Sequence, residues 1–138
     1  MPIDLPDIVD SHCHLDFPEL KRDINEIILR AKKRGVTKFV TICTEPKNLE
    51  GVISLAERFE EIYFAYGLHP MSVSISKKIS LEALVIASKH PKMIGIGETG
   101  LDYYYTSETK AYQKDSLKLH IMAAREAKLP LIIHSRNA

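Results

Sequence analysis

Two histidines separated by a single residue follow the first apolar run of the chain. Residues 10–16 read DSHCHLD. Side chains alternate between the two faces of an extended chain, so both imidazoles would project to one face, with Asp10 and Asp16 beside them. Two neutral imidazoles pack poorly in a core but hold a metal ion well. We therefore interpret His12 and His14 as metal ligands at the end of a strand.

A carboxylate and two further histidines follow later apolar runs. Residues 95–103 read GIGETGLDY, with Glu98 between glycines, and the most apolar run of the chain ends at His134. His69 follows a third run. A carboxylate at the end of an apolar strand is costly to bury unless a positive charge compensates it, as a metal ion would. Because four of the six histidines stand at such ends, we expect one shared metal site.

The other histidines and both cysteines are expected to play structural parts. His90 precedes a proline in a lysine-flanked loop and is expected to be solvated, whereas His120 is expected to lie on a helix, packed or exposed. Cys13 and Cys43 stand in no paired spacing, so we expect two reduced thiols that behave as small apolar groups. The three tyrosines at residues 103–105 could either stack nucleobases or cover the rim of the site.

Short apolar runs alternate with amphipathic stretches along the chain. The runs are rich in β-branched and aromatic residues and predict buried parallel strands at residues 8–12, 38–43, 62–66, 93–97 and 131–134. The amphipathic stretches predict helices over residues 19–33, 46–59, 80–87 and 109–128. Five strands alternating with four helices form an α/β pattern with right-handed crossovers.

Two architectures begin with this pattern. One is an open, doubly wound sheet, and the other is a (β/α)8 barrel, which normally takes about 250 residues. Length alone favours the open sheet or an incomplete barrel. In both architectures the functional groups gather at the carboxyl ends of the strands, which is where the candidate ligands stand.

The composition is that of an ordinary single domain over residues 1–138. The chain is 45% hydrophobic and 27% charged, with 19 basic and 18 acidic residues. A net charge of +1 provides no long-range field for nucleic acid, so a polyanion would be held by a few side chains or by metal ions. No run approaches the roughly 18 apolar residues of a membrane span, and the first residues lack a basic leader. We therefore expect no membrane partner and a cytoplasmic location.

The types of ligand narrow the chemistry. Imidazoles and a carboxylate, without a thiolate in a suitable place, are compatible with Mg²⁺, Mn²⁺ or Zn²⁺. Such an ion would acidify a water molecule and neutralise charge on the group attacked. The predicted reaction class is therefore metal-assisted hydrolysis.

Four blocks of the sequence resemble the TatD family of metal-dependent deoxyribonucleases, which belongs to the amidohydrolase superfamily. The blocks are IVDSHCHLD at residues 8–16, GLHP at 67–70, IGIGETGLDY at 94–103 and PLIIHSR at 130–136. Their order and spacing agree with the family over essentially the whole chain. The resemblance implies a TIM-barrel fold, of which this chain would form the first five strands and four helices.

The resemblance also implies two divalent metal ions and a phosphodiester substrate, namely DNA that is single-stranded or trimmed from its 3′ end. By position, His12 and His14 would bind the first metal. Glu98 would bridge both metals, and His134 would bind the second. An anion between two cations about 3.5–4 Å apart offsets their repulsion, which makes a bridging carboxylate reasonable.

Other positions would serve catalysis and substrate binding in such an enzyme. His69 would contact the substrate phosphate or a metal-bound water and so act beside Glu98 as a catalytic residue. Asp102 would support these groups. Arg136 and Tyr103 would bind substrate.

The family pattern continues where this sequence stops, at Ala138. A full member has three more strands, which bring a further metal-binding histidine and an aspartate. We expect the chain to be a piece of a longer polypeptide, in preference to a split product that needs a complementing chain or a non-catalytic remnant. The fifth strand would then have an unpaired edge, with apolar surface uncovered beside it.

A rival interpretation keeps the superfamily but changes the substrate. A cyclic amidohydrolase or deaminase acting on C–N bonds would also begin with the two spaced histidines. Many such enzymes bridge their metals with a modified lysine at the end of the fourth strand, where this chain has Glu98. We therefore rank the nuclease first.

Overall fold

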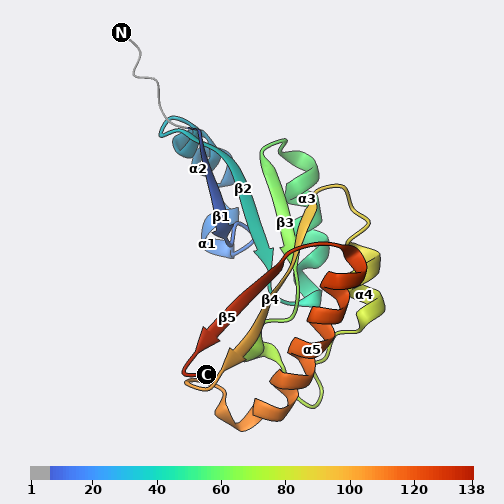
Figure 1. The fold of residues 1–138 in the computed structure, drawn as a ribbon. Helices are drawn as coiled ribbons and strands as arrows, with labels where there is room; N and C mark the ends of the chain where they lie inside the picture. The colour runs from blue at the N-terminus through green and yellow to red at the C-terminus, as the bar shows by residue number, and fades with distance from the viewer. Residues whose placement is uncertain (1–6) are drawn as a thin grey trace.

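The computed structural model describes residues 7–138, which form a curled sheet of five parallel strands (Figure 1). The strands neighbour one another in chain order. They are β1 (Ile8–Cys13), β2 (Val36–Cys43), β3 (Ile62–Tyr66), β4 (Met93–Asp102) and β5 (Leu131–Arg136). A doubly wound sheet reverses its strand order part-way, so this order confirms the barrel type of α/β fold.

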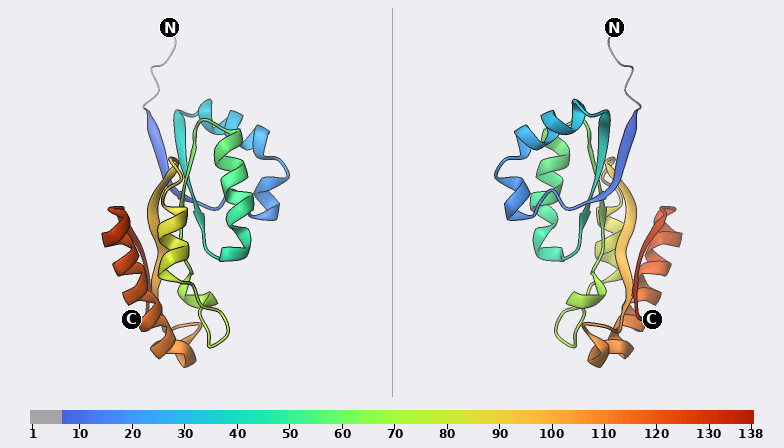
Figure 2. Two further views of the ribbon diagram at one scale, coloured as in Figure 1. Left: turned by 90° about the vertical axis from the view of Figure 1, so that its right-hand side faces the viewer. Right: turned by 90° about the vertical axis from the view of Figure 1, so that its left-hand side faces the viewer.

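Helices connect successive strands, and neighbouring helices touch. They are α1 (Pro18–Lys21), α2 (Ile24–Lys32), α3 (Leu49–Arg58), α4 (Leu81–Ala87) and α5 (Lys110–Ala127), with 3₁₀ turns at Pro46–Asn48, Pro70–Ser72 and Ser107–Thr109. Arg58 of α3 donates a hydrogen bond to Asn25 of α2, and α4 packs against α5 (Figure 2). Ser80 caps α4 as predicted, because its Oγ accepts from the Ala83 N–H at 3.0 Å.

Two predicted elements differ from the structure. The helix expected over residues 19–33 breaks after Lys21 and restarts at Ile24. The restart lets Ile24 and Ile28 become buried, whereas Leu20, before the break, stays exposed. The fourth strand extends past Gly97 to Asp102, and its Gly97–Glu98 peptide bond is cis. This extension makes Glu98 part of a strand instead of a loop.

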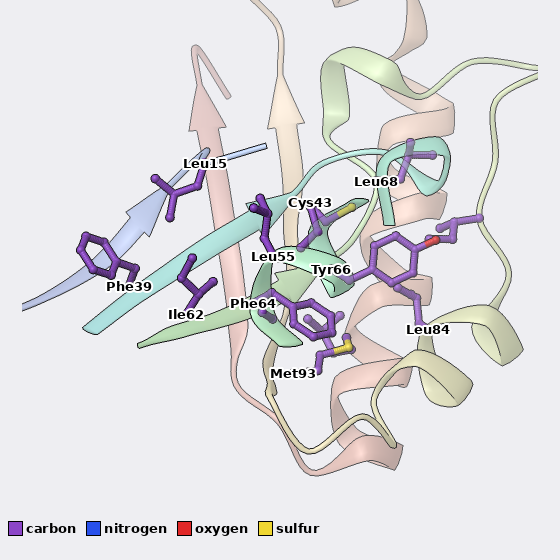
Figure 3. Packing of buried hydrophobic residues seen from close by; sticks show 14 of the residues in the cluster. Leu15, Phe39, Cys43, Leu55, Ile62, Phe64, Tyr66, Leu68, Leu84 and Met93 are labelled. Atoms are coloured by element: carbon purple, nitrogen blue, oxygen red, sulfur yellow. The ribbon is translucent and has the colours of Figure 1, made fainter. Parts of the chain in front are cut away.

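The main core lies between the sheet and the helices (Figure 3). Phe64 of β3 and Met93 of β4 pack there with Leu84 of α4, and all three side chains are almost completely buried. A smaller cluster, built on Val40, Ile42, Ala65 and Ile132, involves the alternate residues of the strands, which face the other side of the sheet. Apolar residues on both faces explain why the strands appear as continuous apolar runs in the sequence.

β1 and β5 form the two edges of the described sheet. Apolar side chains on them are open to solvent: Val9 is 52% exposed and Ile133 is 54% exposed. Within residues 7–138, none of the helices has the length and apolar character needed to cross a membrane.

Candidate metal centre

The side chains predicted as metal ligands meet around Glu98 at the carboxyl ends of the strands. Glu98 Oε2 lies 3.3 Å from His12 Nε2, and Glu98 Oε1 lies 3.2 Å from His134 Nδ1. His69 Nε2 is 3.7 Å from the same Oε1 atom. Two groups of possible ligands result, His12 with His14 and Glu98, and His69 with His134 and Glu98. In each group one nitrogen or oxygen atom per residue lies within 4.8 Å of the others.

The surroundings of Glu98 suit a cation. Glu98 is only 8% exposed. Among residues 7–138 its ion-pair partners are three histidines, and no lysine or arginine pairs with it. A buried carboxylate needs a compensating positive charge, and imidazoles supply one only when they are protonated. A bound metal ion would provide the charge and leave the imidazoles neutral, so the residues present fit the predicted group.

A hydrogen bond from one ring nitrogen of His14 to the backbone fixes the orientation of the ring. Its Nδ1 lies 3.2 Å from the backbone oxygen of Ile42, which can only accept. Nδ1 therefore carries the proton, and the lone pair of Nε2 is free. Phe17 stacks on the ring with centroids 4.7 Å apart, which restrains its rotation. A metal-ligating histidine typically has this arrangement.

His134 is oriented in the same manner by a buried carboxylate. Its Nε2 lies 2.9 Å from Asp102 Oδ2, and Asp102 is fully buried. Burial raises the pKa of Asp102, but hydrogen bonds from the backbone of Tyr105 and from His134 more than offset it, so the pKa lies below its usual value. The ionised carboxylate accepts the Nε2 proton. Nδ1 lies 3.2 Å from Glu98 Oε1 and pairs with it, and this is the nitrogen that a metal ion would use.

His69 differs from these two histidines because its protonated nitrogen faces Glu98. Its Nδ1 accepts a hydrogen bond of 3.1 Å from the backbone N–H of Met71. In the neutral ring the proton must therefore be on Nε2, the atom that faces Glu98. Burial lowers the pKa of His69, although the charge of Glu98 acts in the opposite direction. This tautomer makes His69 a hydrogen-bond donor toward the site and disfavours its use as a ligand.

Asp10 and Asp16, which alternation placed on the same face as the histidines, lie outside both groups. Asp10 Oδ1 accepts from the backbone N–H of His12 at 3.2 Å. Asp16 follows the end of β1, and its Oδ1 is buried without a hydrogen-bond partner in the described part of the chain. The alternation of side chains between the two faces does not extend to Asp16, because β1 ends at Cys13 and the chain turns.

The expectation that His90 is solvated is wrong. Its side chain is only 19% exposed, and its ring lies edge-on to Phe64 with centroids 5.3 Å apart. Nε2 lies 3.2 Å from Glu57 Oε1, and Nδ1 accepts from the Lys92 N–H. The turn after α4 packs against Phe64 of β3. The polar residues around His90 in the sequence do not indicate this contact. His90 nevertheless lies outside both ligand groups.

The residues expected to bind substrate lie beside Asp102. Arg136 Nε is 3.9 Å from Asp102 Oδ2, and the guanidinium lies 4.9 Å from the centre of the Tyr105 ring. Tyr103 is partly buried beneath Lys110, whose Nζ lies 4.6 Å from the ring centre. Tyr104 and Tyr105 are the exposed members of the run, at 61% and 57%.

Both cysteines have free thiols, as predicted. Burial raises the pKa of Cys13 to about 12, and it raises the pKa of Cys43 to the same value. Neither thiol therefore supplies a thiolate ligand near neutral pH.

Two buried polar residues of α5 support the site, and the sequence indicated no functional part for either of them: Gln113 was not considered and His120 was expected to be structural. Gln113 and His120 are both fully buried and bond to the chain segments that carry Asp102 and His69. Of the alternatives for His120, packed or exposed, the structure shows the packed one. The available signal was the placement of polar residues close to the apolar positions Tyr112 and Leu119 of one helix.

Protonation of His120 is expected to destabilise the protein in mild acid. Burial lowers its pKa, while a hydrogen bond to Ser116 partly offsets that effect. The unfolded chain therefore binds this proton first, so stability is fully present above the ordinary pKa of about 6.5 and falls as the pH drops below it. The slope contributed by one group is at most about 1.4 kcal/mol per pH unit. Urea unfolding of the wild type and of His120→Gln between pH 5 and 8 checks this, and equal slopes would contradict it.

A family model described as TatD related DNase matches residues 9–138, nearly the whole chain. The chain belongs to this family. Among TatD-family relatives, the uncharacterized metal-dependent hydrolase YcfH of Escherichia coli K12 is 34% identical over 134 residues, which cover 95% of this chain and 50% of YcfH. Human deoxyribonuclease TATDN3 is 30% identical over 145 residues, which cover 95% of this chain and 53% of TATDN3.

Solved structures of TatD proteins share the fold. The crystal structure of the TatD homologue YjjV from Escherichia coli K12 matches with a TM-score of 0.85 and 35% identity, over 95% of this chain and 51% of YjjV. A TatD-family hydrolase from Entamoeba histolytica matches with a TM-score of 0.82 at 17% identity, which shows the fold alone. The chain spans about half the length of the curated relatives that it matches.

Proposed function

We propose that this TatD-family chain carries the amino-terminal part of a divalent-metal-dependent hydrolase that cleaves phosphodiester bonds in DNA. The observation that carries the proposal is the position of Glu98 within hydrogen-bonding or ion-pairing reach of histidines from both ligand groups. Two-metal phosphodiester hydrolysis uses two cations about 3.5–4 Å apart, and a carboxylate that both can share would hold such a pair. The name of the human relative, a deoxyribonuclease, supports DNA as the substrate.

The proposed ligands are the members of the two groups around Glu98 other than His69. His12 and His14 would hold the first ion, Glu98 would bridge, and His134 Nδ1 would hold the second. Mg²⁺, Mn²⁺ and Zn²⁺ are the candidate ions. When bound, two such ions acidify a water molecule and neutralise the charge of the phosphate.

We assign the remaining residues by what their atoms can donate. His69, with its proton on Nε2, would donate a hydrogen bond to a phosphate oxygen or to the attacking water. Asp102 would keep His134 in its ligand tautomer. Arg136 would neutralise a further phosphate charge, and Tyr103 would contact the nucleotide from the rim. We also propose that the substrate is single-stranded DNA trimmed from its 3′ end, and that the enzyme works in the cytoplasm.

The direct test is hydrolysis of a single-stranded oligonucleotide carrying a label at its 5′ end. With Mn²⁺ or Mg²⁺, the protein is expected to produce a ladder that shortens stepwise from the 3′ end, and EDTA is expected to stop the reaction. The chain of 138 residues and the intact native protein are assayed side by side. No metal-dependent cleavage by either one, or cleavage of dihydropyrimidines in place of DNA, would refute the proposal.

A further inference from the structure

α5 carries two buried polar side chains whose hydrogen bonds lead to the site. Gln113 and His120 stand seven residues apart, which is two turns, or about 10 Å along one helix face. Both side chains are fully buried, although the same helix also contributes apolar residues such as Ala123 to the core. Burying polar groups is unfavourable unless they are hydrogen-bonded, and both residues are.

His120 holds the loop that carries His69. Its Nδ1 donates to the backbone oxygen of Ser116 at 2.7 Å, which leaves Nε2 as an acceptor. That nitrogen accepts the backbone N–H of Leu68 at 3.0 Å. Leu68 directly precedes His69, whose own N–H donates to the backbone oxygen of Thr44. The position of the His69 ring therefore depends on a contact with α5 as well as on the residue that follows β2.

Gln113 holds the end of β4 in a similar way. Its Oε1 accepts the Asp102 N–H at 2.7 Å, and its Nε2 donates to the backbone oxygens of Asp102 at 3.1 Å and Thr106 at 2.7 Å. Asp102 in turn accepts the Nε2 proton of His134. Gln113 thus fixes the backbone of Asp102, the carboxylate that pairs with His134 Nε2, while Glu98 pairs with His134 Nδ1.

The hydrogen bonds of His120 and Gln113 lead to two neighbouring rings, because the ring centroids of His69 and His134 lie 4.5 Å apart. We propose that α5 positions the site through these two residues, with His120 setting His69 and Gln113 setting Asp102 and, through it, His134. Neither residue touches the reacting groups, so both are positioning residues. The effect on metal and phosphate binding rests on the proposed function, whereas the effect on the two rings does not.

The test compares the ring nitrogen signals of the two histidines in the metal-free protein by ¹H–¹⁵N NMR, with the wild type and all variants measured at the same pH. In the wild type, His69 and His134 are both expected to be protonated at Nε2. The amide oxygen of glutamine reaches the place of histidine Nε2, while the shorter side chain of asparagine reaches only the place of Nδ1. His120→Gln should therefore preserve the His69 signal and His120→Asn should change it.

Hydrogen exchange of the Leu68 amide gives a second readout in the same samples. Loss of a buried hydrogen bond is expected to speed exchange by about tenfold to a hundredfold in His120→Asn, and glutamine is expected to restore protection. Gln113→Met, which keeps the length of the side chain but removes its polar atoms, should change the His134 signal and leave His69 unchanged.

Val52→Ala is the matched control for a general loss of stability. Val52 is fully buried in α3, an element that carries none of the predicted site residues, so this variant should lower the melting temperature and leave both ring signals unchanged. The proposal is overturned if His120→Asn and Gln113→Met disturb both rings alike or neither ring. A change of the His69 signal in His120→Gln would also overturn it. If Gln113→Met does not fold, the pair of His120 variants decides.

A Mn²⁺ titration separates this inference from the proposed function. Gln113→Met is expected to weaken Mn²⁺ binding by about tenfold, and His120→Asn is expected to leave it within about twofold of the wild type. If the wild type binds no Mn²⁺, the proposed function fails, but the ring signals still decide whether α5 positions the two histidines.

Discussion

Replacement of Glu98 by glutamine is expected to weaken both metal sites at once. The substitution keeps the size of the side chain and removes the charge that the two histidine groups share. Loss of a partner that merely orients a ligand costs about 10–100-fold in metal affinity, and the loss of a shared ligand should exceed that range. Isothermal titration with Mn²⁺ is therefore expected to show both binding events weakened by more than a hundredfold, with hydrolysis lost as a consequence.

His90→Ala is the matched control for this prediction. His90 also lies beside a glutamate, because its Nε2 is 3.2 Å from Glu57 Oε1, but it belongs to neither ligand group. Its removal should lower stability slightly through lost contact with Phe64 and should leave Mn²⁺ binding unchanged. Equal losses of Mn²⁺ affinity in the two variants would contradict the assignment of the site, as would wild-type affinity at either site in Glu98→Gln.

Replacement of Gly100 by alanine is expected to disrupt the junction of β4 and β5. Gly100 has a φ of 145°, which is unfavourable for residues with a side chain, and it pairs with His134 across the sheet. A Cβ atom there would lie 1.9 Å from the backbone oxygen of His134. Strain and overlap each cost about 1–3 kcal/mol, so the free energy of unfolding should fall by about 3 kcal/mol or more. Urea denaturation measures this loss.

Gly51→Ala, at another glycine of the same chain, is expected to raise the free energy of unfolding instead of lowering it. Gly51 lies inside α3, and a Cβ atom there would meet only Lys21 Nζ at 3.7 Å. Alanine in a helix interior is favoured over glycine by about 0.5–1 kcal/mol, so this variant should be more stable than the wild type. If Gly100→Ala were as stable as Gly51→Ala, the strand pairing that places His134 beside Glu98 would be wrong.

These expectations depend on parts of the structure that were predictable to different degrees. The strand order and the meeting of His12, Glu98 and His134 were predictable, because parallel strands in a barrel bring their carboxyl ends to the same rim. The family resemblance agrees with the match over residues 9–138. Helix boundaries were less predictable, since the apolar spacing over residues 19–33 does not indicate the break that buries Ile24.

The amino-acid sequence by itself determined which residue types stand at the strand ends, because apolar periodicity and the glycines and prolines that interrupt it act locally. Only the tertiary structure decided what each histidine can do. His14 and His134 turn a second ring nitrogen toward the site because Ile42 and Asp102 accept the proton of the first, whereas His69 is a donor because the Met71 N–H occupies its Nδ1. These protons are assigned by partners that often lie far away in the chain, and such partners are set by how strands and helices pack, which no local pattern encodes.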